Sequence, residues 1–275
     1  MSTDFLISDV TPYYKNDEHS ITLFHGDCLQ ILPQLPPSSI DMIFVDPPYF
    51  LSNGGVTCHA GRMVSVNKGE WDISQGVEAN HKFNLSWLCQ CQRVLTANGT
   101  IWITGTAHVI FSVGFAMQQL GFKILNDIIW FKPNASPNLS CRYFTHSTET
   151  VIWAAKNEKS KHVFNYELMK QMSNGKQMRN LWEISPPQPK EKILGKHPTQ
   201  KPLKLLERIL IASTNENDIV LDPFNGSGTT AIASLRLNRK YVGIEICDEY
   251  LGLTVSRLED ELRKPQLHLT ALKAS

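Results

Sequence analysis

The chain has 275 residues, of which 42% are hydrophobic and 19% are charged, and its formal net charge is +1. This composition is typical of a soluble globular protein with one large α/β domain or two small ones. It argues against a secreted or membrane-spanning chain, because the N-terminus shows no signal-peptide pattern and no run of about 18 apolar residues occurs. The six cysteines form no CxxC pair, so we expect a reduced cytosolic protein without a metal site.

Charge is distributed unevenly along the chain. Residues 123–204 contain 14 Lys and Arg against 6 Asp and Glu, a net charge of +8, so the remaining residues together have −7. Such asymmetry predicts a surface that faces a polyanion. A solvated, lysine-rich surface is the alternative interpretation.

Hydrophobic periodicity predicts alternating strands and helices in the first part of the chain. In chain order we expect a strand at 21–24, a short helix or turn broken by Pro33, Pro36 and Pro37, a buried strand at 40–44, a glycine-containing loop at 51–80, a helix at 83–95 capped by Asn98-Gly99, a strand at 100–104, a helix at 109–120, and strands at 124–131 and 148–155. This order is typical of one half of a doubly wound sheet.

The periodicity fades over residues 156–195, which are polar, basic and proline-rich and indicate an insertion. Regular elements then return, with a helix at 203–213, a strand at 219–221, a helix through 231–235, a strand at 241–245 and a helix at 248–262. The whole pattern predicts a doubly wound, mostly parallel, Rossmann-like α/β sheet.

The strand at 40–44 leads into Asp46-Pro47-Pro48-Tyr49. In open α/β sheets, ligands bind at this end of a strand. The prolines remove two N–H donors, so backbone carbonyls and the Asp46 carboxylate remain as acceptors beside an aromatic ring, and such a site suits a planar group with an amine. A proline turn with an aspartate cap is the alternative. Asp27 also follows a strand, where it could accept from a ligand amine or cap the next helix.

A glycine loop lies between the strand at 219–221 and the next helix. Gly226-Ser227-Gly228-Thr229-Thr230-Ala231 matches G-x-G-x-x-A, and Glu245 ends a strand about 20 residues later, as in dinucleotide-binding proteins. The glycines let the backbone approach a ligand and the acid can hold ribose hydroxyls, so any adenosine-containing ligand fits. A nicotinamide oxidoreductase is one alternative, although the preceding Asp222-Pro223-Phe224 and the late position of the loop count against it.

Taken together, Asp46-Pro47-Pro48-Tyr49 and the segment 222–228 resemble the DNA amino-methyltransferases that use S-adenosylmethionine. The order, with the catalytic motif first and the glycine loop last, resembles the β arrangement of that family. His197-Pro198-Thr199-Gln200-Lys201-Pro202 matches the segment before the family's cofactor loop, and Gly26-Asp27-Cys28-Leu29 resembles its short cofactor-contacting stretch. The resemblance implies one circularly permuted methyltransferase domain over 1–275, with a catalytic half at 21–132, a target-recognition insertion at 133–196 and a cofactor-binding half at 197–262.

The resemblance also implies roles for the motif residues. Asp46 and the carbonyl of Pro47 would accept the hydrogens of the target amine, Pro48 completes the motif, and Tyr49 would stack on a base flipped out of the helix. The implied cofactor contacts are Asp222, Pro223, Phe224, Gly226, Ser227, Gly228 and Thr229 at the methionine end and adenine, Glu245 at the ribose, Asp27 and Cys28 at the adenine edge, and Thr199 and Lys201 on the carboxylate side. No metal is required.

The resemblance favours an adenine-specific enzyme, because family members that act on cytosine more often have serine in place of Asp46. The cytosine exocyclic amine is the alternative, and an inactive DNA-binding module is a remoter one. Residues 52–55 and 66–69 resemble the second methylases of GATC restriction-modification systems. We expect a bacterial cytoplasmic protein that associates with the nucleoid through DNA, double-stranded and also single-stranded, and not with a membrane; a homodimer is left open. Base-reading contacts are expected in the insertion and in the 51–80 loop.

Overall fold

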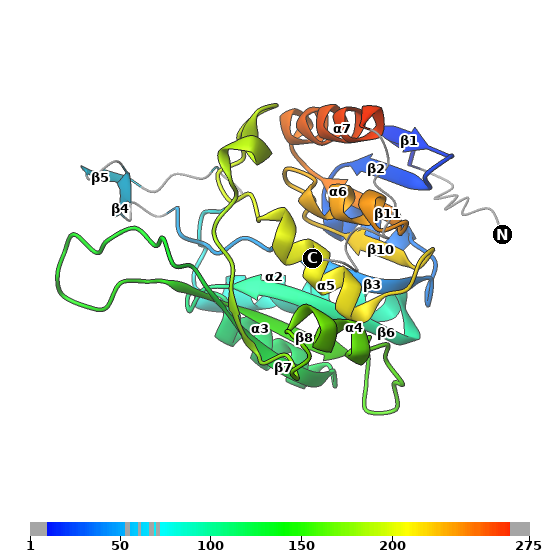
Figure 1. Ribbon diagram of the computed structural model, residues 1–275, viewed down its shortest axis with the longest axis horizontal. Helices are drawn as coiled ribbons and strands as arrows, with labels where there is room; N and C mark the ends of the chain where they lie inside the picture. Colours follow the sequence, from blue (N-terminus) through cyan, green and yellow to red (C-terminus); the bar gives the residue numbers. More distant parts are fainter. Residues whose placement is uncertain (1–9, 53–55, 60–61, 66–68, 70–71, 265–275) are drawn as a thin grey trace.

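The computed structural model describes residues 10–264 apart from 53–55, 60–61, 66–68 and 70–71 (Figure 1). Its main body is a nine-stranded sheet in the order β1-β2-β11-β10-β3-β6-β8-β7-β9. The strands are β1 (Tyr14–Asn16), β2 (Ile21–His25), β3 (Ile40–Val45), β4 (Val56–His59), β5 (Arg62–Ser65), β6 (Leu95–Gly105), β7 (Lys123–Phe131), β8 (Thr148–Ala155), β9 (Leu181–Glu183), β10 (Ile219–Asp222) and β11 (Lys240–Glu245). The helices are α1 (Cys28–Ile31), α2 (Val77–Val94), α3 (Ile110–Gln119), α4 (Tyr166–Met172), α5 (Leu203–Ser213), α6 (Thr229–Arg236) and α7 (Asp248–Arg263), with short 3₁₀ turns at Leu32–Gln34 and Pro189–Lys192.

Five neighbouring strands in this sheet run in parallel. They are β2, β11, β10, β3 and β6, whereas β8 is antiparallel to both β6 and β7. The carboxyl ends of the five parallel strands therefore lie at one edge of the sheet, which is the edge where open α/β sheets bind ligands. The predicted doubly wound, mostly parallel α/β fold is confirmed.

Helices cover both faces of the sheet. On β3, Ile43 packs in an apolar cluster with Trp87 of α2, whereas the next residue, Phe44, packs in the opposite cluster with Leu206 of α5. Successive side chains of a strand point to opposite faces, so a strand that is covered on both faces has a continuous apolar sequence. This burial explains why the stretch before Asp46 shows no alternation. Among the described helices, none is long and apolar enough to span a bilayer.

The boundary between α2 and β6 differs from the prediction. We expected Asn98-Gly99 to end the helix, but α2 ends at Val94 and β6 begins at Leu95, whose backbone pairs with Ile40 of β3. A Cβ atom on Gly99 would lie 3.1 Å from the carbonyl oxygens of Ile40 and Asp41. The glycine is therefore explained by close backbone approach within the sheet and not by a helix cap.

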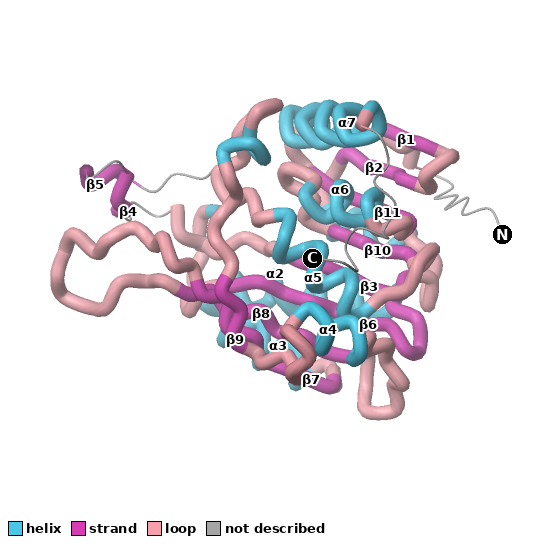
Figure 2. The backbone as a smooth tube through the Cα atoms, viewed as in Figure 1, coloured by secondary structure: helices cyan, strands magenta, loops and turns pink. Residues whose placement is uncertain are grey.

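The structure adds short strands that hydrophobic periodicity did not predict. The short strands β1 and β9 extend the two ends of the sheet, and β4 pairs with β5 inside the predicted 51–80 loop. Because β8 lies inside the sheet between β6 and β7, residues 133–196 do not form a single inserted unit. The parts that leave the sheet are the loop between β7 and β8, which extends on the same side of the view as β4 and β5 (Figure 2), and the segments around β9.

Candidate active site

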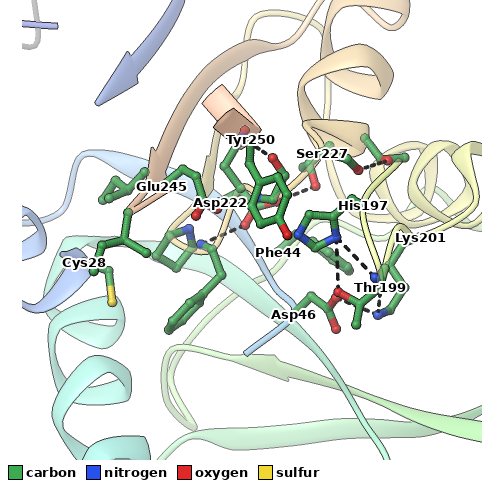
Figure 3. Close-up of a pocket in the computed structure, with 18 of the residues that line it drawn as sticks. Cys28, Phe44, Asp46, His197, Thr199, Lys201, Asp222, Ser227, Glu245 and Tyr250 are labelled. Atoms are coloured by element: carbon green, nitrogen blue, oxygen red, sulfur yellow. Dashed lines mark hydrogen bonds and ion pairs between the residues drawn. The ribbon is translucent and has the colours of Figure 1, made fainter. Parts of the chain in front are cut away.

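Four acidic residues follow neighbouring parallel strands at the carboxyl edge of the sheet. Asp27 lies after β2, Glu245 ends β11, Asp222 ends β10, and Asp46 follows β3. They line one cavity of about 250 Å³, with Cys28 and Glu245 at one end and Asp46 and Lys201 at the other (Figure 3). Strands from the two ends of the chain are neighbours here, because β11 and β10 lie between β2 and β3. Residues that lie far apart in the sequence thus share one pocket.

The glycine loop forms the wall of this cavity beside α6. Gly226 and Gly228 have φ angles of +51° and +70°, a backbone conformation that residues with a side chain rarely adopt. The N–H of Gly226 donates to the Glu245 carboxylate at 2.7 Å, so the loop and the acid at the end of β11 hold each other in place. Burial raises the pKa of Glu245 above its usual value.

Asp222 links β10 to the glycine loop. Its carboxylate accepts from the Thr230 hydroxyl at 2.6 Å and from the N–H of Phe224 at 3.1 Å. The Asp222 side chain is buried, and this burial raises the pKa of its carboxyl from 3.8 to about 7, although the two hydrogen bonds act in the opposite direction. Asp222 therefore has a carboxyl group that titrates near neutral pH.

The raised pKa of Asp222 makes the stability of the fold depend on pH. Between pH 3.8 and about 7 the folded protein keeps a proton that the unfolded chain releases, so this group contributes stability that is lost as pH rises. Each unit of pKa difference is worth about 1.4 kcal/mol. We expect the free energy of unfolding of the wild type, minus that of Asp222→Asn, to fall between pH 5 and pH 7.5 in urea titrations. A difference that stays constant with pH would contradict this assignment.

Asp46 is surrounded by hydrogen-bond donors. Its Oδ1 accepts from the Thr104 hydroxyl at 2.6 Å and can accept from the Tyr49 hydroxyl at 2.8 Å. Its Oδ2 accepts from the Lys201 ammonium at 2.6 Å, and the Lys201 side chain is only 7% exposed. The carboxylate is thus fixed in orientation at the wall of the cavity and paired with a buried cation.

Most residues implied by the resemblance line the cavity; the exceptions are Pro47, Tyr49 and Gly228. The Tyr49 side chain is buried, so base stacking by its ring stays a prediction. Asp27 lines the cavity and also caps α1 by accepting from the N–H of Leu29 at 2.9 Å, so both roles that the sequence left open remain. Lys201 lines the cavity and its ammonium pairs with Asp46, so its expected contact with the carboxylate side of the cofactor stays a prediction.

Several residues of the site were not anticipated from the sequence. His197 and Tyr250 line the cavity with their rings 4.2 Å apart between centroids, and Glu149 of β8 lies behind Asp46. The sequence indicated Glu149 only as an acidic residue near the start of a strand. That start lies at the carboxyl edge of the parallel strands, because β8 is antiparallel to β6. Among the described residues, no group of three or more His, Cys, Asp and Glu is placed to hold a metal ion.

Asp72 organises the loop that follows the Asp46 motif. Its fully buried carboxylate accepts from the N–H groups of Tyr49, Phe50 and Leu51 and from the Ser52 hydroxyl. Phe50 has a φ of +58°, which lets three consecutive N–H groups converge on one carboxylate. The predicted 51–80 loop therefore returns to the Asp46 motif. Residues 53–55 and 66–68, on which most of the GATC-system resemblance depends, lie outside the described residues.

Comparison with known proteins decides the family. A family model described as DNA methylase matches residues 40–256. The chain belongs to the DNA methylase family. The type II methyltransferase M2.DpnII of Streptococcus pneumoniae is 53% identical to it over 251 residues, which cover 91% of this chain and 93% of that protein. The crystal structure of the M1.HpyAVI–SAM complex is 32% identical, with a TM-score of 0.66, and the match covers 86% of this chain and 98% of that chain.

A more distant structure shares the fold. PvuII DNA methyltransferase, described as cytosine-N4-specific, has a TM-score of 0.73 at 22% identity, over 96% of this chain and 94% of its own. The predicted family is confirmed, and the oxidoreductase alternative is set aside. This DNA methylase is an enzyme that uses S-adenosylmethionine and acts on DNA.

The cavity of the methylase fits this cofactor. Gly226 gives the cavity wall one position without a Cβ atom, Glu245 has carboxylate oxygens for ribose hydroxyls, and Asp222 can form an anion beside a cationic methionine end. Phe224 adds an aromatic face, which is held by an edge-on contact with Trp87 at 5.8 Å between centroids. These donors, acceptors and rings match an amino-acid nucleoside.

Proposed function

We propose that this DNA methylase transfers a methyl group from S-adenosylmethionine to the exocyclic amine of adenine, within GATC sites, as the modification enzyme of a restriction-modification system in the bacterial cytoplasm. The observation that carries the proposal is the position of Asp46 in the same cavity as the glycine loop, with its carboxylate fixed by three donors. Aspartate at this position, and type II relatives such as M2.DpnII, support adenine and a restriction-modification role.

The residues around Asp46 account for the chemistry. The exocyclic amine is a poor nucleophile because its lone pair is delocalised into the ring, and the cofactor supplies an already activated sulfonium methyl group. Asp46 and the carbonyl of Pro47 each accept one amine hydrogen, which localises the lone pair on the nitrogen and directs it toward the methyl group. As the N–C bond forms, the bond between the methyl carbon and the sulfonium sulfur would break, leaving the cofactor as a neutral thioether, and the amine proton passes to Asp46 or to water. A flipped base is needed to bring the amine to this depth.

The topology supports a narrower DNA surface than the basic segment 123–204 as a whole. The loop between β7 and β8 leaves the sheet at the edge where Phe131 pairs with Thr148, next to the end of β6, and therefore on the side of Asp46. Lys159 and Lys161 follow the other end of β8, at the opposite edge. We therefore take the 132–147 loop, with the exposed Arg142 in it, as one part of the basic segment that faces the DNA.

Charge reversal tests this placement. We expect Arg142→Glu to weaken binding to duplex DNA by roughly fivefold at low salt, and to reduce the dependence of affinity on salt, because a phosphate contact releases counterions. Lys161→Glu is the matched control, since Lys161 is also exposed but lies at the opposite edge. Fluorescence anisotropy at several salt concentrations measures both effects. Equal affinities of the two variants would move the DNA surface away from this loop.

The site, the form of the DNA and the assembly of the protein are tested with defined substrates. Labelled-methyl transfer to duplexes that differ only in GATC against GTAC should favour GATC by at least about 10²-fold, because each mismatched pair costs roughly 1–3 kcal/mol. Single-stranded oligonucleotides of the same sequence should also accept label. Equal transfer to both duplexes would contradict the GATC assignment.

Sedimentation velocity should detect a homodimer. The exposed Phe111 and Phe115 of α3 form apolar surface that a second copy could cover.

A further inference from the structure

A second carboxylate lies behind Asp46. Glu149, in β8, has a side chain only 10% exposed, and its Oε1 pairs with the ammonium of Lys132 at the end of β7. Its Oε2 lies 3.0 Å from the Tyr49 hydroxyl and 3.8 Å from the ammonium of Lys201. Tyr49 therefore bridges the two carboxylates, because its hydroxyl is also 2.8 Å from Asp46. With one proton, this hydroxyl can donate to only one of them at a time.

Lys201 joins the two carboxylates from the other side. Its ammonium donates to Asp46 at 2.6 Å and to the carbonyl of Thr199 at 3.4 Å, and it lies 5.3 Å from the centre of the Tyr49 ring. Asp46 and Lys201, which line the cavity, thus form one group of two anions and two cations with Glu149 and Lys132, which do not line it. A single unpaired charge at this depth would be costly, so removing one member changes the charge balance felt by the others.

The hydrogen bonds to Asp46 leave one acceptor position of its carboxylate unused. A carboxylate has about four acceptor positions. On Asp46, Thr104 and Tyr49 approach Oδ1, and Lys201 approaches Oδ2. The remaining acceptor position is on Oδ2, beside the Lys201 ammonium. An amine hydrogen that enters the cavity can be accepted there without displacing a donor.

We propose that Lys201 and Glu149 are positioning residues for methyl transfer: Lys201 fixes the orientation of the Asp46 carboxylate so that one acceptor position on Oδ2 stays free, and Glu149, anchored by Lys132, holds Lys201 and Tyr49 in that arrangement. This inference deepens the proposed function and depends on Asp46 accepting the target amine. It assigns Lys201 to the reacting end of the cavity and not to the carboxylate of the cofactor. It also gives a role to Glu149, which no sequence motif had indicated.

The charges around the pair support this assignment. Burial alone would lower the pKa of Lys201, but the Asp46 and Glu149 carboxylates raise it above its usual value. Burial alone would raise the pKa of Glu149, but Lys201 and Lys132 hold it below its usual value. The titratable or charged groups that face Asp46 are Lys201 before α5, Tyr49 on its own loop, Glu149 in β8 with Lys132 behind it, and Asp222 at the end of β10.

Opposite charge changes should therefore have opposite effects on the pH profile. The readout is the single-turnover rate of methyl transfer to duplex DNA between pH 5 and pH 9, with the full-length enzyme saturated with S-adenosylmethionine. In Lys201→Met, Glu149 loses one of the two cations that lower its pKa and takes up a proton more readily, so the pH below which the rate falls should move upward. In Glu149→Gln, which keeps the shape and an acceptor for Tyr49, this pH should move downward.

The methyl-transfer rate and the Kd for S-adenosylmethionine together show whether Lys201 positions Asp46 or contacts the cofactor. We expect Lys201→Met to lower the rate at pH 7.5 by about 10²-fold, while the Kd for S-adenosylmethionine changes by less than about threefold. Lys204→Met, an exposed residue of α5, is the control and should match the wild type. If Lys201→Met fails to fold, the direction in which Glu149→Gln shifts the pH profile of the transfer rate tests the inference alone.

Two results would overturn the inference. One is a Lys201→Met enzyme that binds S-adenosylmethionine more than tenfold more weakly yet transfers methyl groups at the wild-type rate when saturated; this would place Lys201 on the cofactor. The other is a pH profile of Glu149→Gln that is unchanged or shifted upward. Either result with an active wild-type enzyme leaves the proposed function intact, whereas a wild type that does not methylate adenine in DNA refutes the proposed function itself.

Discussion

Asp46→Ala is expected to lower the single-turnover rate of methyl transfer by at least about 10³-fold, while S-adenosylmethionine still binds. The substitution removes the carboxylate that follows β3, and with it the proposed acceptor of the target amine. It leaves the glycine loop and Glu245 in place, because their contacts do not involve Asp46. The measurement is labelled-methyl transfer to DNA, with calorimetric titration of the cofactor in parallel.

A more conservative variant keeps this prediction independent of folding. Asp46→Asn retains one acceptor oxygen but loses the charge that pairs with Lys201. We expect it to transfer methyl groups faster than Asp46→Ala and still far more slowly than the wild type. Circular dichroism and cofactor affinity serve as the controls for folding. Wild-type activity of Asp46→Ala would show that another group accepts the target amine.

Gly228→Ala is expected to weaken the binding of S-adenosylmethionine by at least about 30-fold, because the glycine loop at the cavity cannot keep its conformation. A Cβ atom there would lie 2.4 Å from Cγ2 and 2.7 Å from Oγ1 of Thr254. Thr254 cannot move freely, since its hydroxyl accepts from the Asn225 side chain at 2.9 Å. The φ of +70° adds a cost of roughly 1–2 kcal/mol for a residue with a side chain.

The matched control for Gly228→Ala lies on the helix that carries Thr254. Gly252 of α7 has no atom closer than 4.0 Å to the position of an added Cβ. Gly252→Ala should therefore leave cofactor affinity unchanged and stabilise the fold by about 0.5–1 kcal/mol, as expected for alanine in a helix. Calorimetry and thermal unfolding measure the two quantities. Wild-type affinity in Gly228→Ala would mean that the loop does not form the cofactor site in this conformation.

The parts of the site that could be predicted are those encoded by local sequence. Asp46, Asp222 and Glu245 each follow a short apolar stretch, and parallel strands bring such ends to one edge, so three separate motifs could be placed together. The glycine loop was predictable for the same reason, because a positive φ and close packing require glycine. Gly99 shows the limit of this reasoning: the same residue type signals a helix cap or a close backbone approach, and only the pairing with Ile40 and Asp41 distinguishes the two.

The residues that prediction missed depend on contacts between distant segments. Glu149 bonds to a tyrosine 100 positions away in the sequence, and Lys201 bonds to an aspartate 155 positions away. Neither contact leaves a periodic signal, so Glu149 was not singled out, and Lys201 was expected on the cofactor side. Asp72 lay in a stretch that was predicted only as a loop, although its carboxylate fixes the backbone after Asp46.

The most direct test of the central claim is to identify the methylated nucleoside. Unmethylated duplex DNA containing GATC sites is incubated with the purified protein and labelled S-adenosylmethionine, and the product is digested to nucleosides and separated by chromatography with mass detection. The site built around Asp46 predicts label in N6-methyladenine, and none in the same experiment with Asp46→Ala. Label in N4-methylcytosine, or DNA that remains unlabelled with the wild-type protein, would contradict it.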